Sequence, residues 1–387
     1  MAISKDKKKA IDALMGKVNK KFGAGSISLL VDIQEELKIK FYRTPSHEVN
    51  SMLGGGIGKG KIVEFYGNNS SGKTSMALEI IARAQQEDPE FMAAWIETER
   101  SLDSDYIASF GIDMDRLTVV EQSEELTAEA CMDIIRSLIN SEMFGMIVLN
   151  SVAALSPKKV VEDELEKQNM ALTARLLSKF LRITTGSLGK TKTSLILINQ
   201  VRQNLGSMYG GNVTTGGMAI PFYATQRVEF KREKVMAGDV INEEQGVKIR
   251  CKVVKNRLAK GNPFKICNYY ALYGKGIDGT SELASVLTRE GIISGSSWIY
   301  YPDKENLKKV PSSDGEVEAK WNGKGKFTDF LRENPEGLSF FEKLLDEKLS
   351  SGSAGESVSA EEAKELEDMN KEIEAAASEF SETAATE

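Results

Sequence analysis

The segment that most constrains this chain is residues 67–74, which read Gly-Asn-Asn-Ser-Ser-Gly-Lys-Thr and match the pattern G-x-x-x-x-G-K-[ST]. An apolar run at 62–66 precedes the segment, and a helix-like stretch at 75–81 follows it. A strand, a glycine-rich turn and a helix in this order surround an anion with backbone N–H groups and a helix N-terminus. The chain is therefore predicted to bind a nucleoside triphosphate.

Residues of this loop have distinct predicted tasks. The two glycines let the backbone fold around the phosphates, Lys73 reaches the β- and γ-phosphates, and the Thr74 hydroxyl ligates Mg²⁺. The predicted cofactor-binding residues are Gly67, Asn68, Asn69, Ser70, Ser71, Gly72, Lys73, Thr74 and Ser75.

Bulk composition narrows the class of protein. With 387 residues and 41% apolar content, the chain has room for one large α/β domain with smaller appendages. No stretch approaches the roughly 18 apolar residues needed to span a bilayer, so we expect a cytoplasmic protein with no membrane partner. The single histidine, His47, and three widely spaced cysteines argue against a zinc site and a histidine base.

The style of the sequence divides the chain into four segments. Residues 1–33 hold an amphipathic helix at 4–22, whose apolar stripe needs cover from a neighbouring subunit, which we favour, or from its own domain. Residues 34–275 form the core and residues 276–348 a small α+β lobe. Residues 349–387 form an acidic tail that is predicted to be disordered.

The acidic tail accounts for the net charge. It holds eleven acidic residues and two lysines, so the rest of the chain carries +2 although the formal net charge is −7. The tail is predicted either to aid solubility or to compete with nucleic acid for a basic surface.

Short apolar runs alternate with helical stretches through the core. This alternation predicts an α/β fold with a mostly parallel sheet covered by helices on both faces. Little helix separates the last two runs, so the sheet is expected to close with antiparallel strands. The predicted strands are 62–66, 92–96, 117–120, 146–149, 194–198, 227–230 and 247–254.

Polar residues follow two of these strands at the edge where ligands of parallel sheets bind. Glu99 is expected to hold the attacking water in line with the γ-phosphate. Gln200 is expected near the same phosphate, where it can report the state of the nucleotide. Residues 203–217 are rich in Gly, Asn and Thr and too long for a simple connector, which indicates a functional loop.

The strand at 146–149 ends in Asn150, where such a strand usually ends in an aspartate beside Mg²⁺. An asparagine can accept a hydrogen bond from a metal-bound water, but it brings no negative charge to this hard cation. Three interpretations remain open: slower hydrolysis, a compensating carboxylate elsewhere, or an offset in the alignment of the strand.

Together with the phosphate loop, further segments make the chain resemble RecA-type recombinases over nearly all of residues 4–345. The helicase and clock-protein relatives share the first motifs but not the later ones. The matching segments are 20–27, 67–74, 99–103 with Tyr106, 151–155, Asn-Gln-Val-Arg at 199–202, Thr-Thr-Gly-Gly at 214–217, 222–227 and Lys-Val-Val-Lys-Asn-Arg at 252–257.

The resemblance implies roles for individual residues. Lys255 and Arg257 would reach across the subunit interface to the γ-phosphate of the neighbour, as trans-acting cations do in other phosphoryl-transfer enzymes. The family usually has lysine where this chain has Arg257, a change that keeps charge but not geometry. The implied catalytic residues are Glu99, Lys73, Gln200, Lys255 and Arg257, and the implied adenine contacts are Asp103 and Tyr106, the tyrosine by stacking.

By the same resemblance, two loops at 162–170 and 202–217 would line the DNA. In the family, backbone amides and arginines hold phosphates while an apolar side chain, here Met170 or Leu205, wedges between base triplets. Both contacts are blind to sequence. The alternative for these two side chains is an ordinary core position. Acidic residues in the first loop, and Pro221 where the family tends to have lysine, predict lowered DNA affinity. The implied DNA-binding residues are Met170, Arg175, Arg182, Arg202, Leu205, Gly216 and Gly217.

The resemblance implies an ATP- and Mg²⁺-dependent protein of homologous recombination and DNA repair, with a place in the SOS response to DNA damage. It would form a helical homo-oligomeric filament on single-stranded DNA and exchange strands with double-stranded DNA, helped by loader and single-strand-binding proteins. One alternative is a DNA-coating scaffold that hydrolyses ATP very slowly because of Asn150. Another is a ring helicase, which the segment with Lys255 and Arg257 disfavours.

Overall fold

The computed structural model describes residues 4–23, 25–33, 38–100, 102–123, 125–159, 170–203, 212–236, 241–258 and 265–351. The chain divides into two compact units, with the boundary between Lys40 and Phe41.

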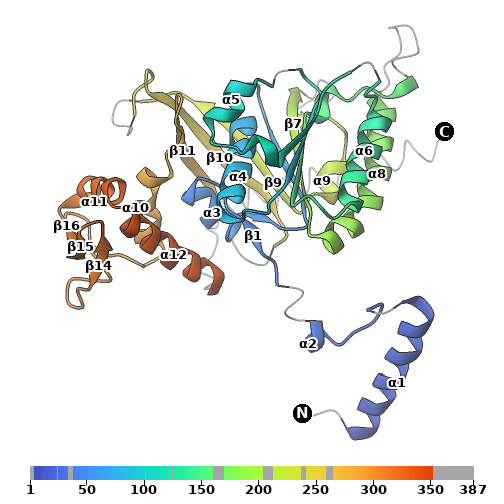
Figure 1. The fold of residues 1–387 in the computed structure, drawn as a ribbon, viewed down its shortest axis with the longest axis horizontal. Coiled ribbons are helices and arrows are strands. Elements are labelled where there is room, and N and C mark those ends of the chain that lie inside the picture. Colours follow the sequence, from blue (N-terminus) through green and yellow to red (C-terminus); the bar gives the residue numbers. More distant parts are fainter. Residues whose placement is uncertain are drawn as a thin grey trace. The chain divides into compact units, whose positions relative to one another are not determined.

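The smaller unit is built on the helix α1 (Lys5–Phe22), drawn in dark blue in Figure 1 and followed by the short α2 (Leu30–Ile33). The Ser4 hydroxyl caps the helix by accepting a hydrogen bond from a first-turn N–H, and Gly23 at φ 103° ends it. No described side chain of this unit is buried. The exposed large apolar residues are Leu14, Phe22, Leu30 and Val31.

A ten-stranded sheet forms the centre of the larger unit, in the order β12-β11-β10-β9-β3-β7-β6-β4-β5, with β8 paired to β7. The strands from β9 to β5 in this order pair in parallel, whereas β10, β11, β12 and β8 pair antiparallel with their neighbours. The bounds are β3 (Ile62–Gly67), β4 (Ala93–Glu97), β5 (Leu117–Val120), β6 (Met146–Asn150), β7 (Ser194–Gln203), β8 (Asn212–Thr214), β9 (Gln226–Glu233), β10 (Gly246–Asn256), β11 (Ile266–Leu272) and β12 (Gly276–Ile277).

The predicted α/β class, with a parallel centre and an antiparallel edge, is confirmed. The prediction did not include β11 and β12, nor the small ladder of β1 (Phe41–Tyr42) with β2 (Ile57–Gly58). It also ended the strand β7 at residue 198, whereas β7 runs on to Gln203.

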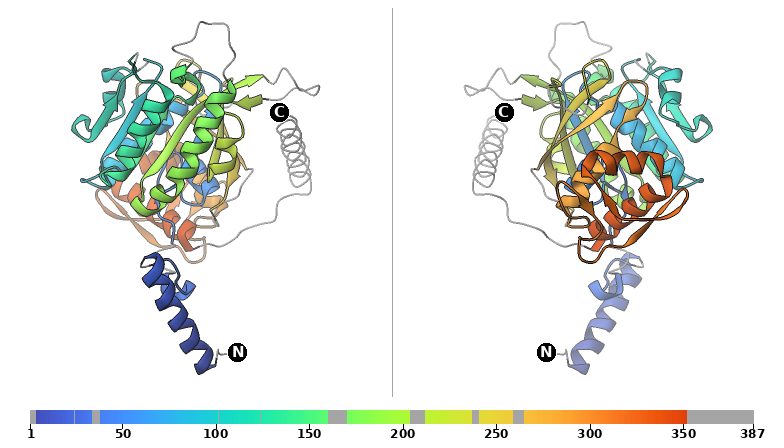
Figure 2. Two further views of the ribbon diagram at one scale, coloured as in Figure 1. Left: turned by 90° about the vertical axis from the view of Figure 1, so that its right-hand side faces the viewer. Right: turned by 90° about the vertical axis from the view of Figure 1, so that its left-hand side faces the viewer.

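Helices cover both faces of the sheet (Figure 1, Figure 2). Alternate residues of the central strands enter different apolar clusters: Phe65 packs with one and Ile62 with the other. Because both faces are buried, these strands read as continuous apolar runs. The helices of the first cluster are α3 (His47–Leu53), α4 (Lys73–Glu87) and α5 (Ser104–Ser109); those of the second are α6 (Ala128–Asn140), α8 (Met170–Thr191) and α9 (Ala219–Tyr223).

A C-terminal lobe follows the sheet and has an apolar cluster of its own. Trp321 lies at its centre, with ring centroids 4.7 Å from Phe327 and 4.9 Å from Phe330. The elements of the lobe are α10 (Gly279–Arg289), β13 (Ile299–Tyr300), β14 (Lys309–Ser312), β15 (Gly315–Glu318), β16 (Lys320–Trp321), α11 (Gly323–Glu333) and α12 (Pro335–Ser351).

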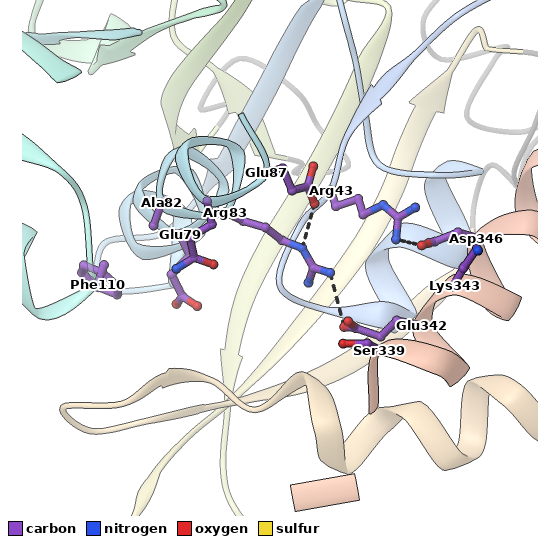
Figure 3. A pocket seen from close by; sticks show the side chains of 11 residues that line it. Arg43, Glu79, Ala82, Arg83, Glu87, Phe110, Ser339, Glu342, Lys343 and Asp346 are labelled. Atoms are coloured by element: carbon purple, nitrogen blue, oxygen red, sulfur yellow. Dashed lines mark hydrogen bonds and ion pairs between the residues drawn. The ribbon is translucent and has the colours of Figure 1, made fainter. Parts of the chain in front are cut away.

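Ion pairs join α12 of the lobe to the core around a cleft of about 660 Å³ (Figure 3). Arg83 of α4 pairs with Glu342 at 3.3 Å, and Arg43 pairs with Asp346. Burial raises the pKa of Glu342, but hydrogen bonds and charges from His47 and Arg83 outweigh it and lower the pKa to about 2. The cleft contains no residue of the predicted nucleotide site.

Membrane-spanning helices, metal-binding clusters and disulfides were considered for the described residues. No helix there is long and apolar enough to cross a bilayer. No group of three or more His, Cys, Asp or Glu side chains in those residues is placed to hold a metal ion. The three cysteines, Cys131, Cys251 and Cys267, are buried and unpaired by disulfides.

Candidate nucleotide site

The phosphate loop lies between β3 and α4, as its sequence predicts. Gly67 is the last residue of β3, and a Cβ atom there would lie 2.1 Å from the carbonyl oxygen of Phe230 on β9. Gly72 caps α4 in the left-handed conformation at φ 89°. Close approach at one glycine and a positive φ at the other explain why both positions need glycine.

Lys73 opens α4 with its side chain folded back into the loop. Its Nζ donates hydrogen bonds to the carbonyl oxygens of Gly67, at 3.2 Å, and Asn68, at 2.6 Å, and to Ser71 Oγ, at 3.3 Å. Burial lowers the pKa of Lys73, and the negative charge of Glu99 opposes this shift. The ammonium group is thus placed among the loop carbonyls and within the field of Glu99.

The predicted adenine contacts lie beside the first turn of α4. Asp103 caps α5 by accepting a hydrogen bond from Tyr106 N at 2.8 Å, and the Tyr106 hydroxyl bonds to Ser75 Oγ at 2.8 Å. The Tyr106 ring is 43% exposed and packs edge-on against Phe110, with centroids 4.9 Å apart. The partly exposed side chain is therefore available to stack on a base, and its hydroxyl bonds to the first turn of α4.

Glu99 follows β4 and meets the ends of two neighbouring strands. Gln200 Nε2 of β7 donates a hydrogen bond to Glu99 Oε1 at 3.0 Å. The Ser151 hydroxyl, which follows β6, donates to the same oxygen. The structure thus brings Glu99, Gln200 and Lys73 together, and it adds Ser151, to which the sequence reasoning gave no role. Glu99 remains exposed to solvent.

Asn150 is the last residue of β6 and lies opposite Glu97 of β4. Asn150 thus stands at the end of the strand, as the sequence predicts, and the three interpretations of its role remain open. Asn150 Nδ2 donates a hydrogen bond to Glu97 Oε2 at 2.9 Å. The sequence reasoning gave Glu97 no role. A sequence feature that could have identified it is its place as the one acidic residue in the apolar strand β4, two positions before Glu99.

The predicted metal-binding residues carry oxygen donors that suit Mg²⁺ bound together with ATP. Mg²⁺ keeps several waters and is held in such sites by one or two protein groups and by substrate phosphates. The Thr74 hydroxyl in the first turn of α4 and the Asn150 amide oxygen are donors of this kind, with Glu97 hydrogen-bonded to Asn150. The donor set fits the predicted cofactor.

Lys255 and Arg257 lie elsewhere. Gly67 is level with Phe230 of β9, whereas Lys255 is level with Arg227, which pairs with Glu64. Three residues at about 3.3 Å and two strands at about 4.8 Å separate Lys255 from the phosphate-loop end of β3. Its Nζ instead donates hydrogen bonds to the carbonyl oxygens of Pro221 and Phe222 in α9, the second at 3.0 Å.

Burial is the main cause that lowers the pKa of Lys255, to about 8, and the positive charges of Arg257 and Arg227 add to it. Arg257 is exposed, and its backbone N–H donates to the Thr225 carbonyl oxygen at 2.9 Å. Among the described residues, the hydrogen bonds of both cations run to the segment 221–225 and not to the phosphate loop.

The predicted DNA contacts fall partly within the described residues. Arg175 and Arg182 are exposed on α8, and Arg202 is exposed on β7. Gly216 and Gly217 follow β8 with φ of 95° and 64° and lie against α8, where a Cβ on Gly216 would be 2.6 Å from Leu177 Cδ1. Met170 is the first residue of α8; Leu205 and the loop before Met170 lie outside the described residues.

Comparison with known proteins gives one consistent answer. The model of the RecA N-terminal domain matches residues 9–278. The protein named Protein RecA from Paenarthrobacter aurescens (strain TC1) is 37% identical over 355 residues, which cover 91% of this chain and 95% of that one. Protein RecA from Prochlorococcus marinus (strain NATL1A) is 33% identical over 353 residues, covering 91% and 88%.

Proposed function

The chain belongs to the RecA family, and from this premise we propose that it is an ATP-dependent protein of homologous recombination and DNA repair that pairs and exchanges DNA strands. The observation that carries the proposal is the convergence of Lys73, Glu99 and Gln200 at one edge of the sheet. A phosphate-binding cation, a carboxylate and an amide are the groups that phosphoryl transfer needs around the γ-phosphate.

In the proposed ATPase reaction, Lys73 exchanges its loop carbonyl contacts for the β- and γ-phosphates. Thr74 and Asn150 would hold hydrated Mg²⁺, and the ion would neutralise charge that develops on the phosphates. Glu99 orients the attacking water and accepts its proton, while the Ser151 hydroxyl fixes the carboxylate. Gln200 exchanges its bond to Glu99 for the γ-phosphate and so reports the state of the nucleotide.

The site requires a second copy of the chain. Lys255 and Arg257 act on the γ-phosphate held by the neighbour, a role that the bonds of Lys255 to the carbonyl oxygens of α9, away from its own phosphate loop, support. Phe222, which is 63% exposed beside Lys255, contributes to the same subunit contact. The exposed stripe of α1 docks on an adjacent core. Copies joined in this way form a helical filament.

The filament holds single-stranded DNA through the two loops predicted at 162–170 and 202–217 and pairs it with a homologous duplex. Arg175, Arg182 and Arg202 offer exposed cations for the phosphates. Loader and single-strand-binding proteins are proposed accessory partners. A slowly hydrolysing scaffold on DNA is the second candidate, and the neutral amide of Asn150 is the observation that favours it.

Two assays test this function. ATP turnover is measured with and without single-stranded DNA, and strand exchange is measured between homologous and heterologous DNA pairs. We expect DNA-stimulated turnover, exchange only with homology, and loss of turnover in Glu99→Gln but not in Glu90→Gln, an exposed carboxylate remote from the site. Absence of turnover in the natural chain supports the scaffold instead. Unchanged turnover in Glu99→Gln overturns the role of Glu99.

A further inference from the structure

Glu97 is a buried carboxylate surrounded by hydrogen-bond donors. It is 2% exposed. Its Oε2 accepts hydrogen bonds from Asn150 Nδ2 at 2.9 Å and from the Trp95 indole nitrogen at 3.0 Å, and its Oε1 accepts from Glu99 N at 3.0 Å. Both carboxylate oxygens of Glu97 thus act as hydrogen-bond acceptors.

The orientation of Asn150 follows from this contact. Its amide nitrogen is committed to Glu97, so its amide oxygen points away from that carboxylate and is left to accept from other groups. An aspartate at position 150 would replace the donated hydrogen bond with two carboxylate oxygens at about the same separation. Like charges in a buried site repel strongly and favour protonation of one partner. With glutamate at position 97, the asparagine at position 150 supplies a donor and avoids this repulsion.

Glu97 also acts on the neighbouring strand end. By accepting from the backbone N–H of Glu99, it fixes the start of the segment that carries the predicted base. The same carboxylate thus holds two residues of the nucleotide site, Asn150 through its side chain and Glu99 through its main chain. Glu97 is the last residue of β4 and pairs with position 150, the position where an aspartate is expected.

We propose that Glu97 supplies the negative charge that position 150 lacks, and that it acts as a positioning residue by holding Asn150 towards the hydrated Mg²⁺ that accompanies ATP. The proposal rests on the proposed ATP-dependent function. Of the three interpretations of Asn150, the proposal adopts the second, a compensating carboxylate. The negative charge then lies on β4 in place of β6, and one hydrogen bond joins the two residues.

A charge-swap series tests the proposal: Glu97→Gln, Asn150→Asp, and the double variant. In the double variant, the amide introduced at position 97 donates to the carboxylate introduced at position 150, so the bond is kept with its polarity reversed. The readout is the affinity of Mn²⁺ for the protein–ATP complex, measured by electron paramagnetic resonance without DNA. ATP binding in EDTA provides the metal-free reference for each variant.

We expect Glu97→Gln to weaken Mn²⁺ binding by about tenfold or more, the range seen when groups that orient metal ligands are removed. Asn150→Asp alone should lower the melting temperature and should not strengthen metal binding, because the new carboxylate opposes Glu97. The double variant should recover most of the affinity lost in Glu97→Gln. Glu90→Gln, a matched loss of one exposed carboxylate, should leave Mn²⁺ affinity unchanged.

Two results overturn the proposal. The first is a change in Mn²⁺ binding free energy in the double variant that equals the sum of the changes in the two single variants. The second is tighter Mn²⁺ binding in Asn150→Asp alone. If Glu97→Gln fails to fold, Glu97→Asp, which keeps the charge, replaces it and must retain Mn²⁺ affinity. Mn²⁺ affinity tests the role of Glu97, whereas DNA-stimulated turnover tests the proposed function. Loss of DNA-stimulated turnover in the natural chain would remove the recombinase function without changing the metal readout.

Discussion

Glu282 joins the C-terminal lobe to the core and makes the stability of the protein depend on pH. It lies on α10 with 6% of its surface exposed. Its Oε2 accepts hydrogen bonds from Ser46 Oγ at 2.7 Å and Glu48 N at 2.9 Å, while its Oε1 has no hydrogen-bond partner among the described residues. Burial is the largest cause that raises its pKa from 4.5 to about 8, although both hydrogen bonds oppose the rise.

The sign of the effect follows from linkage. Between pH 4.5 and about 8 the folded protein keeps a proton on Glu282 that the unfolded chain has lost, so the free energy of unfolding falls as pH rises. At 1.36 kcal/mol for each pKa unit, the loss is complete above pH 8 and amounts to about 4–5 kcal/mol. Glu282→Gln removes the titration and therefore should become more stable than the natural chain as pH rises.

Urea denaturation at pH 5, 7 and 9, followed by tryptophan fluorescence, measures this difference. Trp321 in the lobe reports on the region around α10. The advantage of Glu282→Gln over the natural chain should grow by several kcal/mol from pH 5 to pH 9. Glu316→Gln, an exposed carboxylate on β15, should show no such growth. A constant difference between Glu282→Gln and the natural chain would refute the reasoning.

Three further predictions concern the nucleotide site. Gly67→Ala should abolish ATP binding in a filter-binding assay, because its Cβ would lie 2.1 Å from the Phe230 carbonyl oxygen. Gly186→Ala is the control: the space around Gly186 in α8 is open, so this substitution should raise the free energy of unfolding by about 0.5–1 kcal/mol. Tyr106→Ala should weaken ATP binding about five- to tenfold through lost stacking, and Tyr106→Phe much less; equal losses in a fluorescence titration would contradict stacking. DNA-stimulated turnover should fall as pH rises through about 8, where Lys255 loses its charge, and Lys255→Arg should flatten that pH–rate profile.

The parallel centre of the fold was predictable because burial on both faces leaves an unbroken apolar run in the sequence. The strand β11 gives a weaker pattern, since Ile266 and Asn268 are exposed while Cys267 and Tyr269 are buried. The strand β7 extends beyond its apolar run because tertiary contacts satisfy its polar residues: Asn199 Nδ2 donates to buried Glu64 at 2.8 Å. Such partners are invisible in a single strand read alone.

The same division applies to the site. Glu99 and Gln200 could be predicted because they follow apolar strands whose carboxyl ends share one edge. The contact of Glu97 with Asn150 could not, because it depends on the register of β4 against β6, which join residues 53 positions apart. The resemblance supplied roles for Lys255 and Arg257, and their action on a neighbouring chain stays a prediction.

The strand β7 carries two sets of groups on one continuous backbone. Gln200 bonds to Glu99, and Arg202, two residues later, pairs with Val213 of β8 at the base of the following hairpin. Asn199 Nδ2 also donates to the Thr215 carbonyl oxygen at 2.8 Å, which ties the far side of the hairpin to the same strand. Binding free energies linked through one element are reciprocal. If bound ATP raises the affinity for DNA by a given factor, bound DNA must raise the affinity for ATP by that same factor. Bound DNA would then slow the loss of the nucleotide.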